Sequence, residues 1–267
     1  MLFQNKVVLI TGASSGIGKA LAYSFAKEGA ILSLSARNFD SIEEIKSHLP
    51  DVKINCVRTD VTNESDCKNF IEESIKVFGK VDVLICNAGI SMRAIVDEVE
   101  TNVLHQVMNV NFWGAVYCVK YALPYLLKSK GSVVGISSIA GKKGLPGRSA
   151  YSASKFAMEG FMESLRIENI EKNLHVLVAC PGFTASNIRK KSLTSDGSAQ
   201  SESPREENKM MSAEEVARHI VLATAKRKRD LILSTNGKLT VFLNKIIPGI
   251  SDRLVLKFMK KEPGSPF

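Results

Sequence analysis

The amino-acid sequence predicts an α/β fold, in which a doubly wound parallel sheet of about seven strands is followed by a helical C-terminal extension. Short runs of β-branched residues alternate along the chain with segments whose apolar residues have helical spacing, as in βαβ units. The runs are also nearly all apolar, which is typical of strands covered by helices on both faces. Right-handed crossovers then place helices on both sides of one sheet.

Seven segments are expected to form the strands: 6–10, 31–35, 53–57, 81–86, 132–136, 174–180 and 230–233. Helical spacing of apolar residues predicts helices around residues 17–25 and 70–78, and over 151–170. A further helix is expected after Ser212, whose side chain can cap it, with Glu215 at the third position beyond.

Composition limits the class of protein. The 267 residues are 45% hydrophobic and 24% charged, which excludes a disordered, collagen-like or disulfide-scaffold chain. The five cysteines form no CxxC pair, so we expect the reduced thiols of a cytoplasmic protein and no metal site. The first residues show no signal-peptide pattern, and no stretch of 18 apolar residues predicts a membrane-spanning helix.

The net charge of +9 is concentrated near the C-terminus. Residues 226–267 contain ten basic and three acidic residues, a net +7, so residues 1–225 carry +2. Basic charge is confined to one end of the sequence, and no recognisable motif of a nucleic-acid-binding domain accompanies it. Both observations argue against nucleic-acid binding.

A glycine-rich turn, Thr-Gly-Ala-Ser-Ser-Gly-Ile-Gly at residues 11–18, lies between the first expected strand and helix. Gly12 permits the tight turn, Gly16 lets the backbone approach a pyrophosphate, and Gly18 allows close packing of helix on strand. With the free N–H groups of the helix start, the turn predicts a site for dinucleotide phosphates. Glycine clusters also arise for packing reasons alone, but the strand before and the helix after favour the phosphate site.

The second expected strand ends at Arg37 and Asn38, and no acidic residue follows until Asp40. Enzymes that use NAD usually place an acid here for the ribose 2′-hydroxyl. Arg37 can instead bind a 2′-phosphate, which predicts NADP(H) as the cofactor. The alternative is that Arg37 is a solvated surface arginine.

Tyr151 and Lys155 are four residues apart and share one face of an expected helix. A free tyrosine has a pKa of about 10. A nearby ammonium group and an oxidised nicotinamide are expected to lower the pKa of Tyr151. Tyr151 is then suited to exchange a proton with an oxygen undergoing hydride transfer.

These motifs together resemble the short-chain dehydrogenase/reductase family. The glycine-rich turn, Asn87-Ala88-Gly89, Asn111, Ser138, the Tyr151–Lys155 pair and Pro181-Gly182 occur in the order and spacing of that family, over about residues 5–235. The resemblance implies a single-domain Rossmann fold over residues 1–235 that binds NADP(H). It also implies an oxidoreductase that interconverts a secondary alcohol and a ketone, assembled as a homodimer or homotetramer.

The resemblance assigns catalytic roles. Tyr151 is the acid/base, Lys155 lowers its pKa and holds the nicotinamide ribose, and Ser138 hydrogen-bonds the substrate oxygen. Ser137 is adjacent, but the thirteen-residue spacing to Tyr151 favours Ser138. Asn111 holds a water molecule that links Lys155 to solvent, or bonds the backbone of a kinked helix, and both roles are compatible.

The resemblance also assigns cofactor contacts. Asp60 accepts from the adenine amino group, with a helix cap as its alternative role. After Pro-Gly, Ser186 takes the place of the usual threonine, while Thr184 replaces an aliphatic residue. The full set of cofactor contacts comprises Gly12, Ser14, Ser15, Gly16, Ile17, Gly18, Arg37, Asn38, Asp60, Val61, Asn87, Ala88, Gly89, Tyr151, Lys155, Pro181, Gly182, Thr184 and Ser186.

Residues 183–211 correspond to the substrate lid of the family, and their polar part, Ser192–Asn208, is expected to be exposed and mobile. An apolar pocket is expected from Phe183, Leu193, Met210, Met211, Met92, Leu145 and Pro146. The chain looks most like the hydroxysteroid-dehydrogenase-like and lipid-ketone-reducing branches, with a 3-oxoacyl-carrier-protein reductase as the second fit. An NADP-sensing regulator is a non-enzymatic alternative.

The basic extension, residues 236–267, has apolar residues interleaved with lysines and is expected to form two short helices broken at Pro248-Gly249. Two interpretations stand. The helices cover the body or a dimer partner, or they lie on an anionic membrane surface without spanning it.

Overall fold

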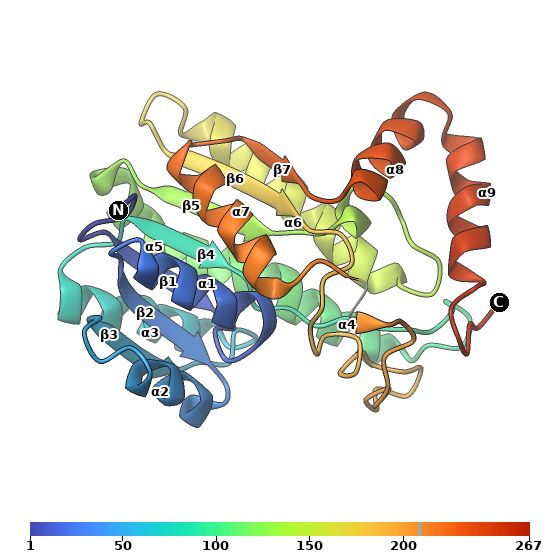
Figure 1. Ribbon diagram of the computed structural model, residues 1–267, viewed down its shortest axis with the longest axis horizontal. Coiled ribbons are helices and arrows are strands. Elements are labelled where there is room, and N and C mark those ends of the chain that lie inside the picture. Colours follow the sequence, from blue (N-terminus) through green and yellow to red (C-terminus); the bar gives the residue numbers. More distant parts are fainter. Residues whose placement is uncertain (208–209) are drawn as a thin grey trace.

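The computed structural model describes residues 1–207 and 210–267 and contains a seven-stranded sheet in the order β3-β2-β1-β4-β5-β6-β7 (Figure 1). Every pair of neighbouring strands is parallel. The predicted α/β class is confirmed, and each strand lies within two residues of its expected bounds. The strands are β1 Val7–Thr11, β2 Ile31–Ala36, β3 Ile54–Arg58, β4 Val83–Cys86, β5 Ser132–Ile136, β6 His175–Cys180 and β7 Asp230–Ile232.

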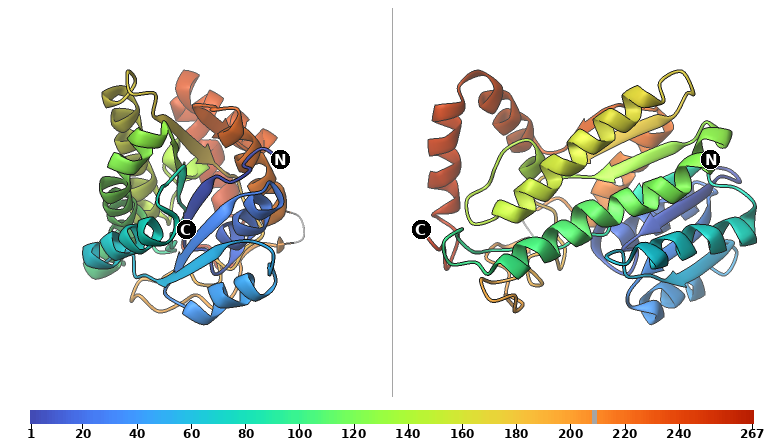
Figure 2. Two further views of the ribbon diagram at one scale, coloured as in Figure 1. Left: turned by 90° about the vertical axis from the view of Figure 1, so that its left-hand side faces the viewer. Right: turned by 180° about the vertical axis from the view of Figure 1, so that it is seen from behind.

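Helices cover both faces of the sheet (Figure 2). One face carries α1 Gly16–Lys27, α2 Phe39–Ser47 and α7 Ala213–Ala225. The other carries α3 Glu64–Phe78, α4 Thr101–Met108, the π-helical turn η1 Asn109–Trp113, α5 Gly114–Ser129 and α6 Ser149–Glu168. A 3₁₀ turn, η2 Ile139–Gly141, follows β5.

Two apolar cores result from the alternation of side chains along the strands. In β1, Val8 and Ile10 enter the core under α1 and α7, while Val7 and Leu9 enter the core under α3, α5 and α6. This period of two is why an all-apolar strand is compatible with helices on both faces.

The strand order reverses between β1 and β4, which are neighbours in the middle of the sheet. The connections after these two strands leave on opposite faces, so a crevice opens beyond their carboxyl ends. This crevice is where the fold places a ligand site.

The C-terminal extension forms a hairpin of two helices, α8 Thr235–Ile246 and α9 Pro248–Met259, beyond the carboxyl ends of the strands (Figure 1). The two helices were expected, but the break lies at Ile247, and Pro248 is the first residue of α9. Ile247 has φ −135° and ψ 64°, because the residue before a proline is forced out of the helical region.

The polar stretch after β6 differs in part from its prediction as an exposed loop. Ser192, Leu193 and Pro204 are buried, and Arg205 makes contacts with the C-terminal extension. The packing of a segment distant in sequence covers these residues, which composition alone does not reveal. Asn208, the last residue of the predicted stretch, lies outside the described residues.

Candidate active site

A cavity of about 790 Å³ opens at the carboxyl ends of the strands. It is lined by the glycine-rich turn, the ends of β2, β4, β5 and β6, the start of α6 and the C-terminal helices. All of the predicted site residues line this cavity except Gly18 and Asn111. One cavity therefore brings together the residues assigned to the cofactor and those assigned to the chemistry.

The glycine-rich turn has no room for side chains at two positions. Gly12 has a φ of +65°, and a Cβ atom there would lie 2.8 Å from the Cα of Ala88. A Cβ on Gly18 would lie 2.2 Å from the carbonyl oxygen of Gly12. Gly18 thus serves the packing of α1 on the turn, while Ser14, Ser15 and Ile17 border the cavity at the start of α1. The cradle fits the phosphates of a dinucleotide.

Asn87 fixes the end of β4 to the glycine-rich turn. Its side-chain amide donates to the carbonyl oxygens of Thr11 at 2.9 Å and Gly12 at 3.1 Å. The hydroxyl of Thr11 accepts from the backbone N–H groups of Asn87 at 3.0 Å and Ala88 at 3.1 Å. These four bonds hold two walls of the cavity in register.

Arg37 and Asn38 lie at the carboxyl end of β2 and border the cavity. Arg37 is exposed, and Asn38 caps α2 by accepting from the backbone N–H of Ser41. Asp60 also lines the cavity, and its carboxylate accepts from the backbone N–H of Thr62 at 3.0 Å and from its hydroxyl at 2.8 Å. The alternative role of Asp60 as a helix cap is wrong, because Asn63 is the N-cap of α3.

Ser138, Tyr151 and Lys155 meet at the centre of the cavity. Ser138 follows β5, and its side chain shares a hydrogen bond with that of Tyr151, which lies in the first turn of α6. The hydroxyl of Ser137 instead donates to the Glu159 carboxylate at 2.8 Å, so Ser138 is the serine that faces Tyr151. The Lys155 ammonium donates to the carbonyl oxygen of Ile136 at 2.8 Å and lies 5.7 Å from the centre of the Tyr151 ring.

Burial shifts the pKa values of both catalytic candidates. The pKa of Lys155 falls to about 8, because its ammonium group is removed from water. Burial also raises the pKa of Tyr151, against the lowering effects of the Ser138 hydrogen bond and of the positive charges of Arg148 and Arg189. The expected lowering of the Tyr151 pKa therefore does not hold in the protein alone, where burial favours the protonated phenol.

Asn111 lies in η1 and is fully buried behind the cavity. Its side chain accepts from the backbone N–H of Ile90 at 2.8 Å and donates to the Ile90 carbonyl at 2.9 Å and to the Ser154 hydroxyl at 2.9 Å. It thus ties the segment after β4 to α6, and its two bonds to Ile90 agree with the alternative role of a buried asparagine that bonds backbone. The water-holding role stays a prediction.

The substrate end of the cavity differs from its prediction. Phe183 and Leu145 line it, whereas Met210 and Met211 line a neighbouring groove and Met92 and Leu193 pack in a small separate core. Sequence reasoning missed Arg148, Arg189 and the residues that the extension contributes. The apolar side chains among the latter are Leu239, Leu243, Leu254, Val255, Phe258 and Met259. The amphipathic spacing of the extension was visible, but a periodic pattern does not identify the surface on which a helix packs.

Within residues 1–207 and 210–267, no cluster of His, Cys, Asp and Glu is arranged to hold a metal ion. In the same ranges, no helix has the length and hydropathy needed to cross a membrane.

Comparison with known proteins gives a consistent result. A family model described as short chain dehydrogenase matches residues 6–197. Dehydrogenase/reductase SDR family member 7B of Mus musculus is 36% identical over 271 residues, which covers 97% of this chain and 83% of the relative. The 11-beta-hydroxysteroid dehydrogenase-like 2 protein of Arabidopsis thaliana is 44% identical over 187 residues, covering 68% of this chain and 60% of the relative.

Two solved structures share the fold. An alcohol dehydrogenase from the archaeon Thermococcus sibiricus, complexed with 5-hydroxy-NADP, is 25% identical with a TM-score of 0.77, covering 86% of this chain and 96% of its own. A short chain dehydrogenase/reductase from Burkholderia phymatum, in complex with NAD, is 24% identical with a TM-score of 0.83. The match covers 94% of this chain and 96% of the solved one.

Proposed function

Because this chain belongs to the short chain dehydrogenase family of oxidoreductases, we propose that it is an NADP(H)-dependent enzyme that interconverts a secondary alcohol and a ketone, acting as a reductase on a hydrophobic carbonyl compound. The observation that carries the proposal is the meeting of Ser138, Tyr151 and Lys155 in the cavity that the glycine-rich turn also lines.

The residues divide the reaction between them. NADPH, when bound, supplies the hydride for the carbonyl carbon. Tyr151 gives its phenol proton to the carbonyl oxygen, and the Ser138 hydroxyl hydrogen-bonds the same oxygen. Lys155 is placed to hold the nicotinamide ribose and to stabilise the phenolate that Tyr151 becomes. The hydride and the proton together convert the ketone to the alcohol.

Arg37 supports NADP(H) over NAD(H). It lines the cavity at the end of β2, and the first acid after the strand, Asp40, lies in the first turn of α2. A guanidinium at this place can pair with a 2′-phosphate, and no carboxylate at the strand end repels it. The Thermococcus sibiricus relative was solved with an NADP derivative.

The apolar lining of the substrate end supports a hydrophobic substrate. Phe183, Leu239, Leu254 and Phe258 contribute from two segments that are separate in sequence. The Arabidopsis thaliana relatives named as 11-beta-hydroxysteroid dehydrogenase-like favour a steroid- or lipid-like carbonyl compound. The free state of all five cysteines supports a reducing compartment, the cytoplasm.

The outer face of the extension supports peripheral contact with a membrane. Phe242, Ile246 and Ile250 are exposed by 59%, 62% and 53%, and Lys245 and Arg253 stand among them. Apolar side chains with interleaved cations fit the headgroup region of an anionic bilayer. Leu239 and Leu243 of α8 line the cavity, and Ile246 lies one turn further along the same side of the helix, so an apolar substrate has a path from lipid into the cavity.

A homodimer or homotetramer is proposed for the body. Trp113 and Phe156 are exposed by 43% and 47% on η1 and α6, which pack side by side. Exposed aromatic residues on adjacent elements are typical of an interface. Light scattering of the purified protein tests this assembly.

Fluorescence titration tests the proposed function. NADPH should bind more tightly than NADH, and oxidation of NADPH should follow addition of an apolar ketone. NADPH binding without turnover of any ketone or 3-oxoacyl thioester would indicate an NADP-sensing regulator. Turnover restricted to 3-oxoacyl thioesters would indicate a 3-oxoacyl-carrier-protein reductase.

A further inference from the structure

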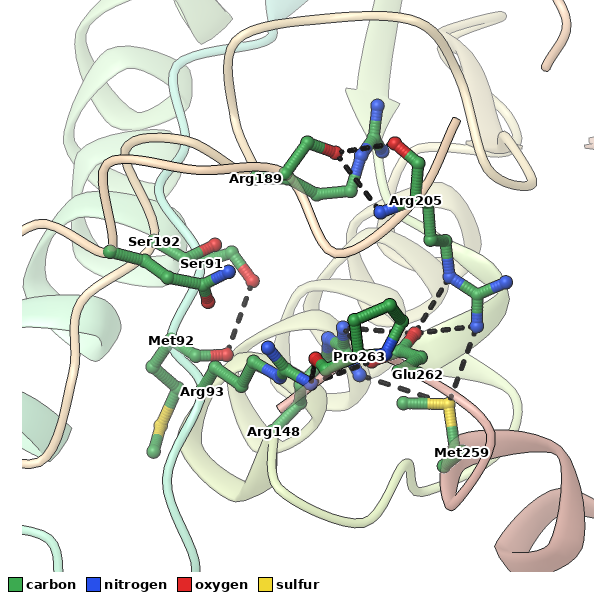
Figure 3. A network of polar contacts seen from close by, with 12 residues as sticks. Ser91, Met92, Arg93, Arg148, Arg189, Ser192, Arg205, Met259, Glu262 and Pro263 are labelled. Atoms are coloured by element: carbon green, nitrogen blue, oxygen red, sulfur yellow. Dashed lines mark hydrogen bonds and ion pairs between the residues drawn. The ribbon is translucent and has the colours of Figure 1, made fainter. Parts of the chain in front are cut away.

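Glu262, three residues beyond α9, is a buried carboxylate surrounded by three arginines (Figure 3). Arg205 donates from Nε to Oε1 at 2.7 Å, and Arg148 donates from a terminal nitrogen to Oε2 at 3.0 Å. Arg93 lies 3.8 Å from Oε2 and donates to the carbonyl oxygen of Pro263 at 2.7 Å. Glu262 has 4% of its side chain exposed.

The three arginines come from three different segments around the substrate end. Arg93 lies in the connection after β4, and Arg148 immediately precedes α6, three residues before Tyr151. Arg205 belongs to the connection between β6 and α7. The side-chain carboxylate of Glu262 thus joins three segments that are more than fifty residues apart in sequence.

Arg205 links this cluster to the cavity wall. Its guanidinium lies 3.9 Å from the centre of the Phe183 ring and 4.5 Å from that of Phe258. Both rings line the main cavity and also a neighbouring groove that Arg205 borders. The stack of Arg205 on the two rings therefore separates the cavity from the groove.

The charges of the cluster depend on Glu262. Burial lowers the pKa values of Arg93 and Arg205. Repulsion from Arg148 and Arg205 lowers the pKa of Arg93 further, repulsion from Arg148 and Arg189 does so for Arg205, and the Glu262 carboxylate opposes these effects. Removal of one partner from a buried ion pair leaves a charge without compensation and is strongly unfavourable. Without Glu262 the arginines are expected to separate and to release the segment that now joins them.

A second attachment holds the other end of the hairpin. The Lys143 ammonium donates to the side-chain oxygen of Asn244 in α8 at 2.9 Å and forms an ion pair with Asp252 in α9. Asn244 donates in return to the carbonyl oxygen of Lys142 at 3.1 Å. The hairpin is fixed near its turn by Lys143 and at its C-terminal end by Glu262.

We propose that Glu262 is a positioning residue, which holds α9 against the body so that Leu254 and Phe258 close the substrate end and favour long apolar ketones over short ones. This inference rests on the proposed function. Glu262 does not contact the reacting atoms. It acts through Arg148 and Arg205, which border the cavity and its aromatic partition.

The test compares Glu262→Gln with a matched control, Glu163→Gln. Glu163 pairs with Arg229 at 2.6 Å on an exposed surface far from the cavity. Hydrogen exchange of residues 248–259 reports whether α9 is held. Calorimetric binding of 2-undecanone and 2-butanone to the protein saturated with NADP⁺, which has no hydride to give them, reports whether the wall is intact. Steady-state kinetics with both ketones separates KM from kcat.

For Glu262→Gln we expect faster exchange in α9 and about tenfold weaker binding and higher KM for 2-undecanone. Binding of 2-butanone, kcat and NADPH affinity should stay within about twofold. The lost contacts are to the long alkyl chain of 2-undecanone, and they stabilise the bound ketone and the transition state equally. Glu262→Asp should recover part of the affinity for 2-undecanone, and Glu163→Gln should match the wild type.

A second variant keeps the test decisive if Glu262→Gln fails to fold. Phe258→Leu removes the aromatic partition without leaving a buried charge, and it should also weaken 2-undecanone binding more than 2-butanone binding. Unchanged exchange in α9, or equal losses for both ketones, would overturn the proposal. Wild-type protein that binds the ketones but oxidises NADPH with none of them would refute the proposed function, while hydrogen exchange and calorimetry would still show whether Glu262 holds α9.

Discussion

At the scale of single residues, Tyr151 is governed by opposing influences. Burial raises its pKa, and the Ser138 hydrogen bond with the charges of Arg148 and Arg189 acts in the other direction. The sequence motif identified Tyr151, Ser138 and Lys155, because their spacing is local or recurrent. It did not identify Arg148 and Arg189 as neighbours of Tyr151, since a charge that acts through space leaves no pattern along the chain.

Removal of the Tyr151 hydroxyl tests its role as proton donor. Tyr151→Phe should lower kcat by about 10²–10⁴-fold, the usual contribution of a positioned acid, and leave NADPH affinity within about threefold. Stopped-flow kinetics and fluorescence titration measure the two quantities. Tyr125→Phe, on the exposed side of α5, serves as the control. A variant that keeps more than about a tenth of kcat would exclude Tyr151 as the acid.

The raised pKa of Tyr151 also predicts the pH dependence of each direction. Reduction needs the Tyr151 phenol, which stays protonated below the raised pKa, and the Lys155 ammonium, whose pKa is about 8, so kcat/KM for the ketone should be flat from about pH 6 to 7 and begin to fall near pH 8. Oxidation of the alcohol needs the phenolate, so its kcat/KM should rise by up to about tenfold per pH unit over the same range. Rate profiles in both directions check this. A reduction rate that falls steadily from about pH 6 to 7 would contradict it.

Arg37 is expected to determine cofactor preference. Arg37→Ala should weaken NADPH binding by about 1.5–3 kcal/mol, the size of a charged hydrogen bond, and leave NADH binding unchanged. Fluorescence titration with both cofactors provides the measurement. Equal affinity of the wild type for NADPH and NADH would show that Arg37 is a solvated surface residue.

At the scale of helices and strands, the sequence was most informative where structure is determined locally. The strand β5 was predicted at its observed bounds, because an apolar β-branched run has few alternatives. The break at Ile247 lay one residue from its prediction, since proline restricts the residue before it. The burial of Ser192 and Pro204 was not predictable, because it depends on the packing of distant segments.

The N-cap of α7 tests whether a residue next to a helix start contributes to stability as its local sequence predicts. The Ser212 hydroxyl accepts from the backbone N–H of Glu215 at 3.1 Å and caps the helix. Ser212→Ala should lower the free energy of unfolding by about 1 kcal/mol, and Ser212→Gly by a few tenths, because glycine suits the cap position. Denaturant titration measures both variants. Equal effects of alanine and glycine would mean that the cap bond contributes nothing.

At the scale of the whole molecule, the hairpin of α8 and α9 has two unlike faces. One lines the cavity through Leu239 and Leu243, and the other presents Phe242 and Lys245 to the surroundings, with Ile246 next to the cavity-lining side. Sequence reasoning left two interpretations of this segment open. The structure supports packing on the body for the inner face, and the outer face is left for a lipid surface or a second copy of the chain.

Vesicle co-sedimentation distinguishes these partners. The protein should bind anionic vesicles, with binding weakened by salt, and a triple replacement of Phe242, Ile246 and Ile250 by serine should abolish it. A double replacement of Ile167 and Ile170, which are exposed by 64% and 69% elsewhere, is the matched control. No binding at low salt would refute the membrane contact. A change of mass in light scattering on triple replacement would indicate a second copy instead.

The position of the hairpin at the chain end has a consequence for how such enzymes diversify. Tyr151 and the glycine-rich turn lie in α6 and after β1, whereas one wall of the substrate end is contributed by residues 235–259. Replacement of that terminal segment would exchange the specificity of the enzyme while its chemistry stayed in place. Chimaeras joined at Ser234, with Glu262 and its arginines kept, are therefore the natural units for engineering new substrates.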